Sequence, residues 1–197
     1  MNILEIMKQN KSYVSGYEST PMEKQYYAKE LCWKYNQTLP KEQDKRIEIL
    51  KELFGTCSDY VFIEPSFRCD YGFNIHIHGF TFINYNCVIL DNSPVNIGNG
   101  AFIAPGVCIA CSGHAIHPEQ RAKGVGTSAP ITIEDNVWIG ANSTVCGGVT
   151  IGKGSIIGAG SVVKKNIPVG VIAAGSPCKV IRKITEEDKI KPEDILY

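Results

Sequence analysis

The sequence predicts a mostly β fold, a parallel β-helix with an N-terminal helical segment and a short C-terminal tail. Aliphatic residues recur at every sixth position through the C-terminal two thirds of the chain, and glycine is frequent in the same region. A period of six fits neither a helix, which needs about 3.6, nor a simple strand, which needs 2. We expect a helical region over 1–57, the β-helix over 58–182 with an excursion loop at 111–130, and a tail over 183–197.

The six-residue period is the signature of short strands separated by corners. The unbroken set comprises Ile133, Ile139, Val145, Ile151, Ile157 and Val163. An earlier set comprises Ile77, Ile83, Ile89 and Val95, followed after a shift of two positions by Ile97, Ile103 and Ile109. Stacked coils of this kind bury a continuous aliphatic column and pair neighbouring backbones. Corners that need unusual dihedral angles are expected at Gly140, Gly148, Gly152, Gly154, Gly158 and Gly160.

Two helices are expected before the repeat begins. Residues 20–23, Thr-Pro-Met-Glu, have the pattern of a capping box with proline at the first helical position. One helix is expected to follow over 24–35, and a second over 41–54 with Gly55 as its C-cap. The apolar face of the first helix is predicted to hold Tyr27, Leu31 and Tyr35.

Composition excludes several classes of partner. Lys plus Arg and Asp plus Glu both total 20, so the formal net charge is zero and nothing favours nucleic acid or an anionic membrane. No apolar run reaches the roughly 18 residues of a membrane span. The first eight residues are too few and too charged for a signal peptide, which predicts a cytoplasmic protein.

Eight cysteines occur, and without a secretion signal they are expected to remain thiols. Cys108 and Cys111 form a CxxC, but a zinc site of this kind needs a second pair, which is missing. We therefore expect no metal requirement, and small apolar thiols filling an interior.

Four segments of the chain form distinctive motifs: Ser112-Gly113-His114 in the excursion loop, residues 131–140 (ITIEDNVWIG), residues 174–182 (AGSPCKVIR) and residues 67–75 (FRCDYGFNI). Together these motifs resemble the maltose and galactoside O-acetyltransferases. The resemblance covers almost the whole chain. It implies left-handed coils of three hexapeptides, a homotrimer with active sites between subunits, and acetyl-CoA as the co-substrate that donates the acetyl group to a small-molecule acceptor, a sugar or a sugar-like compound.

The same resemblance implies a set of site residues. His114 corresponds to the loop histidine that acts as general base, a role that suits an imidazole because it is largely neutral at cellular pH. Acceptor contacts correspond to Asp70 and Asn84, which together accept and donate hydrogen bonds. The backbone N–H of Ala141 corresponds to the donor that stabilises the oxyanion. Coenzyme contacts correspond to Ala141, Ala159, Lys164, Lys165 and Arg182, with Trp138 lining the same cleft.

Three positions depart from the family pattern, all on the acceptor side. Ala115 follows His114 where the family has a proline, which predicts a looser loop. Tyr17 stands where an N-terminal acceptor-binding aspartate is expected, unless Glu18 takes that place. Asn92 stands where the galactoside branch has a second acidic contact. These departures leave the acceptor unidentified.

Other interpretations remain open at the level of sequence. His117 competes with His114 as the base, Asp70 fits a corner cap, Asn84 fits an asparagine ladder, and the lysine pair fits a solvated surface. A γ-type carbonic anhydrase would use three histidines on an interfacial zinc, for which His78, His114 and His117 are the available set. A non-enzymatic scaffold, or an acetyltransferase for serine, an antibiotic or a polysaccharide sugar, are further alternatives.

Overall fold

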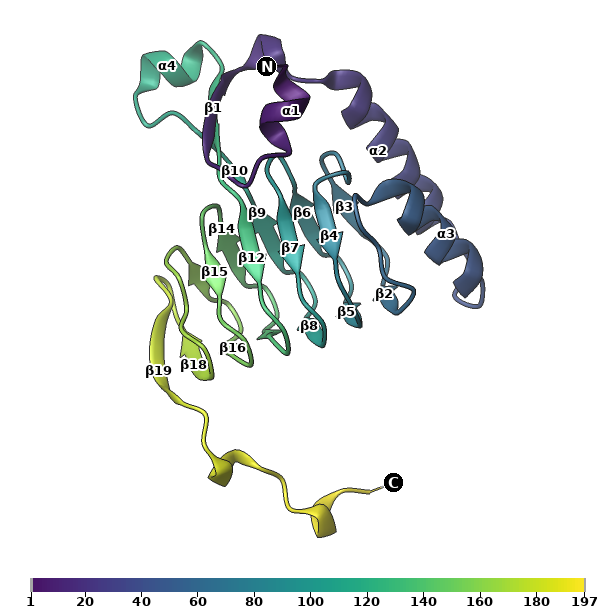
Figure 1. The fold of residues 1–197 in the computed structure, drawn as a ribbon, viewed down its shortest axis with the longest axis vertical. Helices are drawn as coiled ribbons and strands as arrows, with labels where there is room; N and C mark the ends of the chain where they lie inside the picture. Colours follow the sequence, from purple (N-terminus) through teal and green to yellow (C-terminus); the bar gives the residue numbers. More distant parts are fainter. Residues whose placement is uncertain (1, 197) are drawn as a thin grey trace.

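The computed structural model describes residues 2–196, and its body is a parallel β-helix with three walls (Figure 1). The first wall is a four-stranded sheet of β4 (Ile75–Ile77), β7 (Val95–Ile97), β12 (Ile131–Ile133) and β15 (Thr150–Ile151). The second is a seven-stranded sheet of β2 (Val61–Ile63), β5 (Thr81–Ile83), β8 (Ala101–Ile103), β13 (Trp138–Ile139), β16 (Ile156–Ile157), β18 (Val171–Ala174) and β19 (Lys179–Lys183). The third is a five-stranded sheet of β3 (Arg68–Cys69), β6 (Val88–Leu90), β9 (Cys108–Ala110), β14 (Thr144–Cys146) and β17 (Val162–Val163).

Aliphatic side chains stack in register inside these walls. Ile103 pairs with Ile83 in the coil before it and with Ile139 in the coil after it, all in parallel strands. All thirteen residues of the predicted hexapeptide sets are at most 1% exposed, which confirms the predicted inward column. Each column buries apolar surface at the same positions where neighbouring backbones pair, so packing and hydrogen bonding stabilise the same register.

The two-position shift in the repeat has a structural location. It falls in the corner between β6 and β7, where residues 91–94 turn the chain from the third wall back to the first. This corner contains the fully buried Asp91 and Ser93. The shift therefore marks a corner that encloses polar side chains rather than a break in the fold.

The corner glycines act in two different ways. Gly148, Gly154 and Gly160 have φ of 84°, 69° and 69°, as the sequence predicts for unusual dihedrals. Gly140, Gly152 and Gly158 do not, so that part of the prediction is wrong. Their constraint is space: a Cβ on Gly140 would lie 2.6 Å from the Ala159 nitrogen, because successive coils approach closely there.

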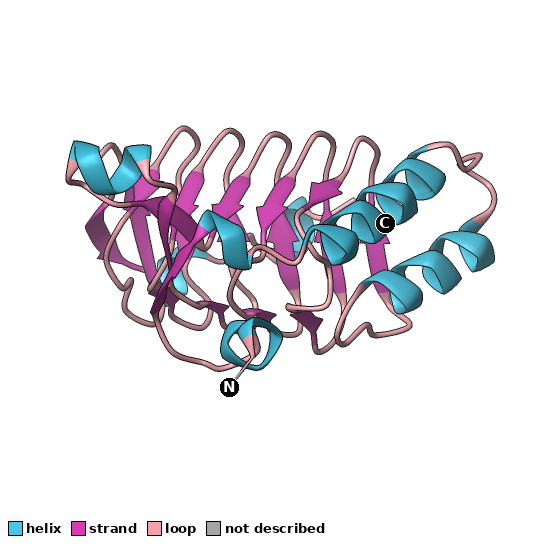
Figure 2. Cartoon of the chain, turned by 90° about the horizontal axis from the view of Figure 1, so that it is seen from above, coloured by secondary structure: helices cyan, strands magenta, loops and turns pink. Residues whose placement is uncertain are grey.

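Two helices, α2 (Met22–Asn36) and α3 (Gln43–Leu53), lie together at one end of the β-helix, where α2 contacts β3 (Figure 2). They follow α1 (Ile3–Met7) and the 3₁₀ turn η1 (Tyr17–Ser19) in the chain. The Tyr35 hydroxyl donates to the Ile63 carbonyl at 2.5 Å. The Asn36 side chain accepts from the Phe67 N–H and donates to the Phe67 carbonyl, both at 2.9 Å. These bonds satisfy backbone groups that would otherwise face the open end of the first coil.

Details of the predicted helices are corrected. Pro21 is the N-cap of α2 and no side chain caps the helix, so the predicted capping box is absent. The C-cap of α3 is Phe54 rather than Gly55. Leu31 and Tyr35 are buried as predicted, but Tyr27 is 48% exposed, because the buried face of α2 runs through Ala28 and Cys32 instead.

After β19 the chain leads away from the β-helix through two short 3₁₀ turns, η2 (Glu186–Asp188) and η3 (Pro192–Asp194) (Figure 1). Within residues 2–196, none of the helices combines the length and apolar character that crossing a bilayer requires.

The aliphatic column yields a stability prediction. Ile103→Ala is expected to lower the free energy of unfolding by about 2–5 kcal/mol, because it leaves a cavity between two close-packed coils. Ile103→Val removes one methyl group and keeps the branched shape, so about 0.5–1.5 kcal/mol is expected. Urea unfolding followed by circular dichroism measures both. Equal losses for the two variants would contradict the packing argument.

Candidate active site

The excursion loop builds a small antiparallel sheet beside the β-helix. β10 (Ser112–His114) continues the chain beyond β9, and β11 (Val125–Ser128) returns alongside it, with His114 opposite Gly126. Between them lies the short helix α4 (Pro118–Ala122). The Arg121 guanidinium donates to the carbonyls of Ala115 and Ile116, both at 3.0 Å. His114 is thus an exposed side chain on a paired strand.

The backbone of Ala115, the residue after His114, takes part in the pairing of this loop. The Ala115 N–H donates to the Val125 carbonyl at 3.0 Å and extends the β10–β11 pairing by one bond. A proline has no N–H to donate and could not make this bond.

The N-terminal segment adds a third strand to β10 and β11, and we call this three-stranded sheet the loop sheet. The sequence analysis did not predict this strand. β1 (Tyr13–Gly16) pairs antiparallel with β11, Ser15 lying opposite Gly126. The Tyr13 hydroxyl also donates to the Asn92 carbonyl at 2.8 Å. β1 has only four residues and its one aliphatic side chain, Val14, is exposed, so its sequence shows no apolar pattern that would predict a strand. The strand is recognised only from its pairing with β11, which lies far away in the sequence.

A cavity of about 470 Å³ opens where the loop sheet meets the β-helix. His114 and Asp70, predicted as base and acceptor contact, both line it. Tyr17 and Asn92, two of the positions that depart from the family pattern, line the same cavity. One chain therefore brings the histidine, the carboxylate and these two positions to a single hollow.

The Asp70 carboxylate lies in a partly desolvated position just after β3. Burial raises its pKa above the ordinary value, and the nearby Lys29 ammonium opposes this rise. Its backbone N–H donates to the Asp91 carboxylate at 3.1 Å. A carboxylate with little competing water forms stronger hydrogen bonds to a ligand hydroxyl than an exposed one.

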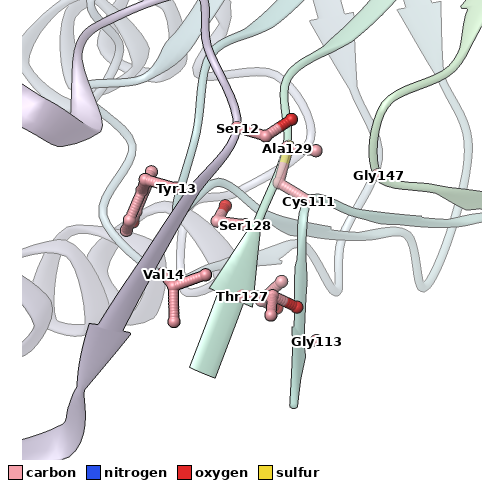
Figure 3. Close-up of a pocket in the computed structure, with 10 residues that line it drawn as sticks. Ser12, Tyr13, Val14, Cys111, Gly113, Thr127, Ser128, Ala129 and Gly147 are labelled. Carbon is pink, nitrogen blue, oxygen red and sulfur yellow. The ribbon is translucent and has the colours of Figure 1, made fainter. Parts of the chain in front are cut away.

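A second hollow, of about 380 Å³, also borders the loop sheet (Figure 3). It shares Tyr13, Gly113, Thr127 and Ser128 with the first. The Cys111 thiol lies at its border, and burial raises the pKa of this thiol to about 12. Cys111 is consequently an unreactive thiol, as expected of a small buried side chain.

Metal ligands do not converge within one chain. Among residues 2–196, no three His, Cys, Asp or Glu side chains form a group that could hold a metal ion, and Cys108 and Cys111 are accordingly not joined by a third possible ligand. His76 and His78 stack with ring centroids 6.5 Å apart, whereas His114 lies on the loop sheet and His117 just beyond it, before α4.

The other predicted site residues lie along different edges of the β-helix. We call the corners 84–87, 104–107, 140–143 and 158–161 the second–third edge, because each joins the second wall to the third. Asn84, Ala141 and Ala159 all lie on it. We call the corners 70–74, 91–94, the loop 111–130 and the corners 147–149 and 164–166 the third–first edge. Asp70, His114, Lys164 and Lys165 lie there.

The second–third edge offers backbone donors. Within residues 2–196 the N–H groups of Ala141 and Ala159 donate to no acceptor, while the neighbouring Gly140 donates to Ile157 at 2.7 Å. The position that stacks on Asn84 in the next coil is Ala104, so Asn84 is not part of an asparagine ladder. Asn84 does not line the cavity that holds His114.

Arg182 lies on β19 beside the second wall. Its guanidinium makes a bidentate ion pair with Asp188 at 2.6 and 2.7 Å, which ties the C-terminal tail to the β-helix. This pair holds the pKa of Asp188 well below its usual range. Lys164, Lys165 and Trp138 are exposed, as ligand-contacting or solvated side chains would be.

Comparison with known proteins gives the family. The model "Maltose acetyltransferase hexapeptide capping motif" matches residues 7–58, and "Bacterial transferase hexapeptide (six repeats)" matches residues 130–165. Galactoside O-acetyltransferase of Escherichia coli K12 is 42% identical over 189 residues, which cover 96% of this chain and 93% of that protein. The chain belongs to the maltose and galactoside acetyltransferase family.

Solved structures agree with this family. A maltose O-acetyltransferase from Clostridium difficile 630 has a TM-score of 0.87 at 40% identity, covering 94% of this chain and 99% of that one. A galactoside acetyltransferase in complex with coenzyme A has a TM-score of 0.87 at 41% identity, covering 98% and 96%. The predicted left-handed parallel β-helix is confirmed, and the chain is an acetyltransferase. This decides against the carbonic anhydrase and scaffold alternatives.

The loop sheet yields a prediction about proteolysis. Deleting residues 1–19 removes β1 and the Tyr13 hydroxyl bond, so β11 keeps only one neighbouring strand. Trypsin is expected to cut after Arg121 and Lys123 several times faster than in the full chain, because cleavage needs local opening. Deleting residues 190–197 leaves the loop sheet intact and serves as the control. Unchanged cleavage at these sites would show that β1 does not hold the loop.

Proposed function

We propose that this acetyltransferase moves the acetyl group of acetyl-CoA to a hydroxyl of a small sugar or sugar-like acceptor, with His114 as general base. Acetyl-CoA is the co-substrate, and the galactoside acetyltransferase with the same fold binds coenzyme A. The observation that carries the proposal is the cavity in which one chain presents both His114 and Asp70. The protein is proposed to work in the cytoplasm, where acetyl-CoA is available.

The chemistry follows from the groups present. The His114 imidazole removes the proton of the acceptor hydroxyl while that oxygen attacks the thioester carbonyl. The negative charge that develops on the carbonyl oxygen needs a fixed donor, for which the unpaired Ala141 N–H is suited. Collapse of the tetrahedral intermediate breaks the carbon–sulfur bond. The imidazolium then returns its proton to the departing thiolate, giving the acetyl ester and free coenzyme A.

This mechanism requires two copies of the chain at each site. His114 and Asp70 lie on the third–first edge, whereas Ala141 and Asn84 lie on the second–third edge, with the whole third wall between them. Within one chain they cannot meet. We propose that the third–first edge of one protomer faces the second–third edge of the next in a closed ring. The number of protomers, three, comes from the resemblance to the family and not from this geometry.

The side chains at the acceptor end of the site support a hydroxyl compound as the proposed acceptor. The Asp70 carboxylate accepts from hydroxyl donors, and the Asn84 amide of a neighbouring protomer adds a group that donates and accepts. Tyr17 and Asn92 place neutral groups in the same cavity, where the family pattern predicts acidic ones. These neutral side chains distinguish the acceptor site from the galactoside branch, while serine and antibiotic acceptors remain alternatives for the same chemistry.

Coenzyme binding is proposed for Ala141, Ala159, Lys164, Lys165 and Arg182. The two lysines are exposed and free to neutralise phosphate groups. Arg182 is already paired with Asp188, so a phosphate would have to replace that carboxylate or share the guanidinium with it.

The role of His114 is tested by thiol release from acetyl-CoA. With wild-type protein and a panel of glucose, maltose, galactosides, amino sugars, serine and chloramphenicol, we expect release with one sugar class. His114→Ala is expected to lower kcat by about 100-fold or more while acetyl-CoA still binds. His117→Ala is the matched control and should keep its activity. Loss of activity in His117→Ala alone would reverse the assignment.

The shared site is tested by complementation. We expect His114→Ala and Asn84→Ala chains to be weak alone. Co-expressed in equal amounts, they should restore about a quarter of the sites, because each site draws its two protomers independently. Co-expressed His114→Ala and Asp70→Ala chains are the control. They should show no rescue, since both residues come from the same chain. Equal behaviour of the two mixtures would contradict a site of this composition.

A further inference from the structure

Asp91 is a carboxylate with no exposed surface, buried behind the acceptor end of the cavity. Its Oδ1 atom accepts the backbone N–H of Asp70 at 3.1 Å and of Tyr71 at 2.8 Å. Its Oδ2 atom accepts the Asn74 N–H at 3.4 Å. The Asn74 side chain donates back to the Asp91 carbonyl at 3.0 Å. One side chain thus holds the turn that carries Asp70.

The two residues after Asp91 attach the same corner to the opposite side of the cavity. The Asn92 carbonyl accepts the Tyr13 hydroxyl of β1 at 2.8 Å. The Ser93 hydroxyl pairs with the Ser128 hydroxyl of β11 at 2.7 Å. Since β11 pairs with the strand that carries His114, residues 91–93 connect both sides of the cavity. The two-position shift in the hexapeptide repeat is what makes room for this corner.

The surroundings of Asp91 make its charge costly. The pKa of Asp91 is raised to about 7, chiefly by burial; the bond from the Tyr71 N–H opposes the rise, the nearby Asp70 carboxylate adds to it, and the bond from Asn74 also opposes it. The other titratable groups that interact with it are Tyr13 of β1, Cys32 of α2, Cys69 of β3, Tyr71 after β3 and Cys111 of the loop. None of these is a cation.

The sign of this cost argues that the carboxylate is not present for stability. Because the pKa is higher in the folded than in the unfolded chain, the folded state binds more protons, and stability falls as the pH rises from the ordinary value of 3.8 to about 7. An uncharged side chain would avoid this loss.

We propose that Asp91 is a positioning residue of the acceptor site, which orients the Asp70 carboxylate through the backbone N–H groups of Asp70 and Tyr71. This inference rests on the proposed role of Asp70 as an acceptor contact. Asp91 does not line the cavity and touches no substrate. Its effect is therefore expected on acceptor binding, because none of the residues proposed to bind the coenzyme is a hydrogen-bond partner of Asp91.

Two variants separate positioning from mere folding. Asp91→Ala leaves the three N–H groups without an acceptor, and the acceptor KM is expected to rise by about tenfold or more. Asp91→Asn keeps one oxygen for the Asp70 and Tyr71 N–H groups, although its amide NH₂ opposes the Asn74 N–H. Its acceptor KM should stay within about threefold of wild type. In both variants the acetyl-CoA KM should be unchanged.

Asp135→Ala is the matched control. The Asp135 carboxylate also accepts a backbone N–H from the neighbouring coil, that of Asn99 at 3.0 Å. It lies, however, on the corner between the first and second walls. Its removal should leave the acceptor KM unchanged. If the acceptor KM of Asp135→Ala rose as much as that of Asp91→Ala, the cause would be a general loosening of the coils, and the proposal would be overturned.

Two further readouts distinguish this proposal from a purely structural role. Asp91→Asn should raise the melting temperature at neutral pH, because it removes the costly ionisation. The wild-type acceptor KM should rise by no more than about threefold as the pH falls from about 8 to about 6, because a protonated carboxyl, like the amide of Asp91→Asn, keeps one oxygen for the N–H groups but attracts them less; Asp91→Asn should lack this rise. A lower melting temperature with an unchanged acceptor KM in both variants would make Asp91 structural only.

The experiment also separates this inference from the proposed function. His114-dependent thiol release by the wild type, together with an unchanged acceptor KM in Asp91→Ala, overturns the positioning role alone. Absence of release by the wild type with every acceptor overturns both. Faster hydrogen exchange at the Asp70 and Tyr71 amides of Asp91→Ala, with the expected KM changes, supports the positioning role.

Discussion

The in-register stacking of short parallel strands is the interaction on which the rest of this structure depends. Each coil places an aliphatic side chain such as Ile83, Ile103 or Ile139 directly over the last, while the backbones pair at the same positions. Packing density and hydrogen bonding therefore favour one register, and a slip of one residue would turn the column outward. This rigidity gives the molecule straight edges on which functional groups can be placed at fixed spacing.

The edges also limit what one chain can do. Asp70 and the loop of His114 follow strands of the third wall, whereas Asn84 and Ala141 follow strands of the second. Groups on different edges of one β-helix stay apart because the wall between them does not bend. The proposed reaction needs groups from both edges, so a stiff scaffold makes it depend on more than one copy of the chain; that the copies number three is what the resemblance to the family implies.

The third–first edge is where the regular repeat gives way to polar structure. The corner at 91–94 and the loop at 111–130 both replace ordinary tight corners, and β1 arrives from the N-terminus to pair with the loop. Two hydrogen bonds connect the corner to the loop sheet: Tyr13 of β1 donates to the Asn92 carbonyl, and the hydroxyls of Ser93 and Ser128 pair with each other. Burial raises the pKa of Asp91, so its charged form is costly at neutral pH, and the large aliphatic core of the β-helix offsets that cost.

The sequence by itself determined the features that repeat. The six-residue period located the buried column, including Ile77 to Ile109, and motif resemblance selected His114 and Asp70, which the structure then places in one cavity. Only the tertiary structure decided the pairing of β1 with β11, the space constraint at Gly140 and the hydrogen bonds of Asp91. The reason is physical. A periodic apolar pattern records burial locally, whereas a single polar side chain shows its partners only when distant segments are brought together.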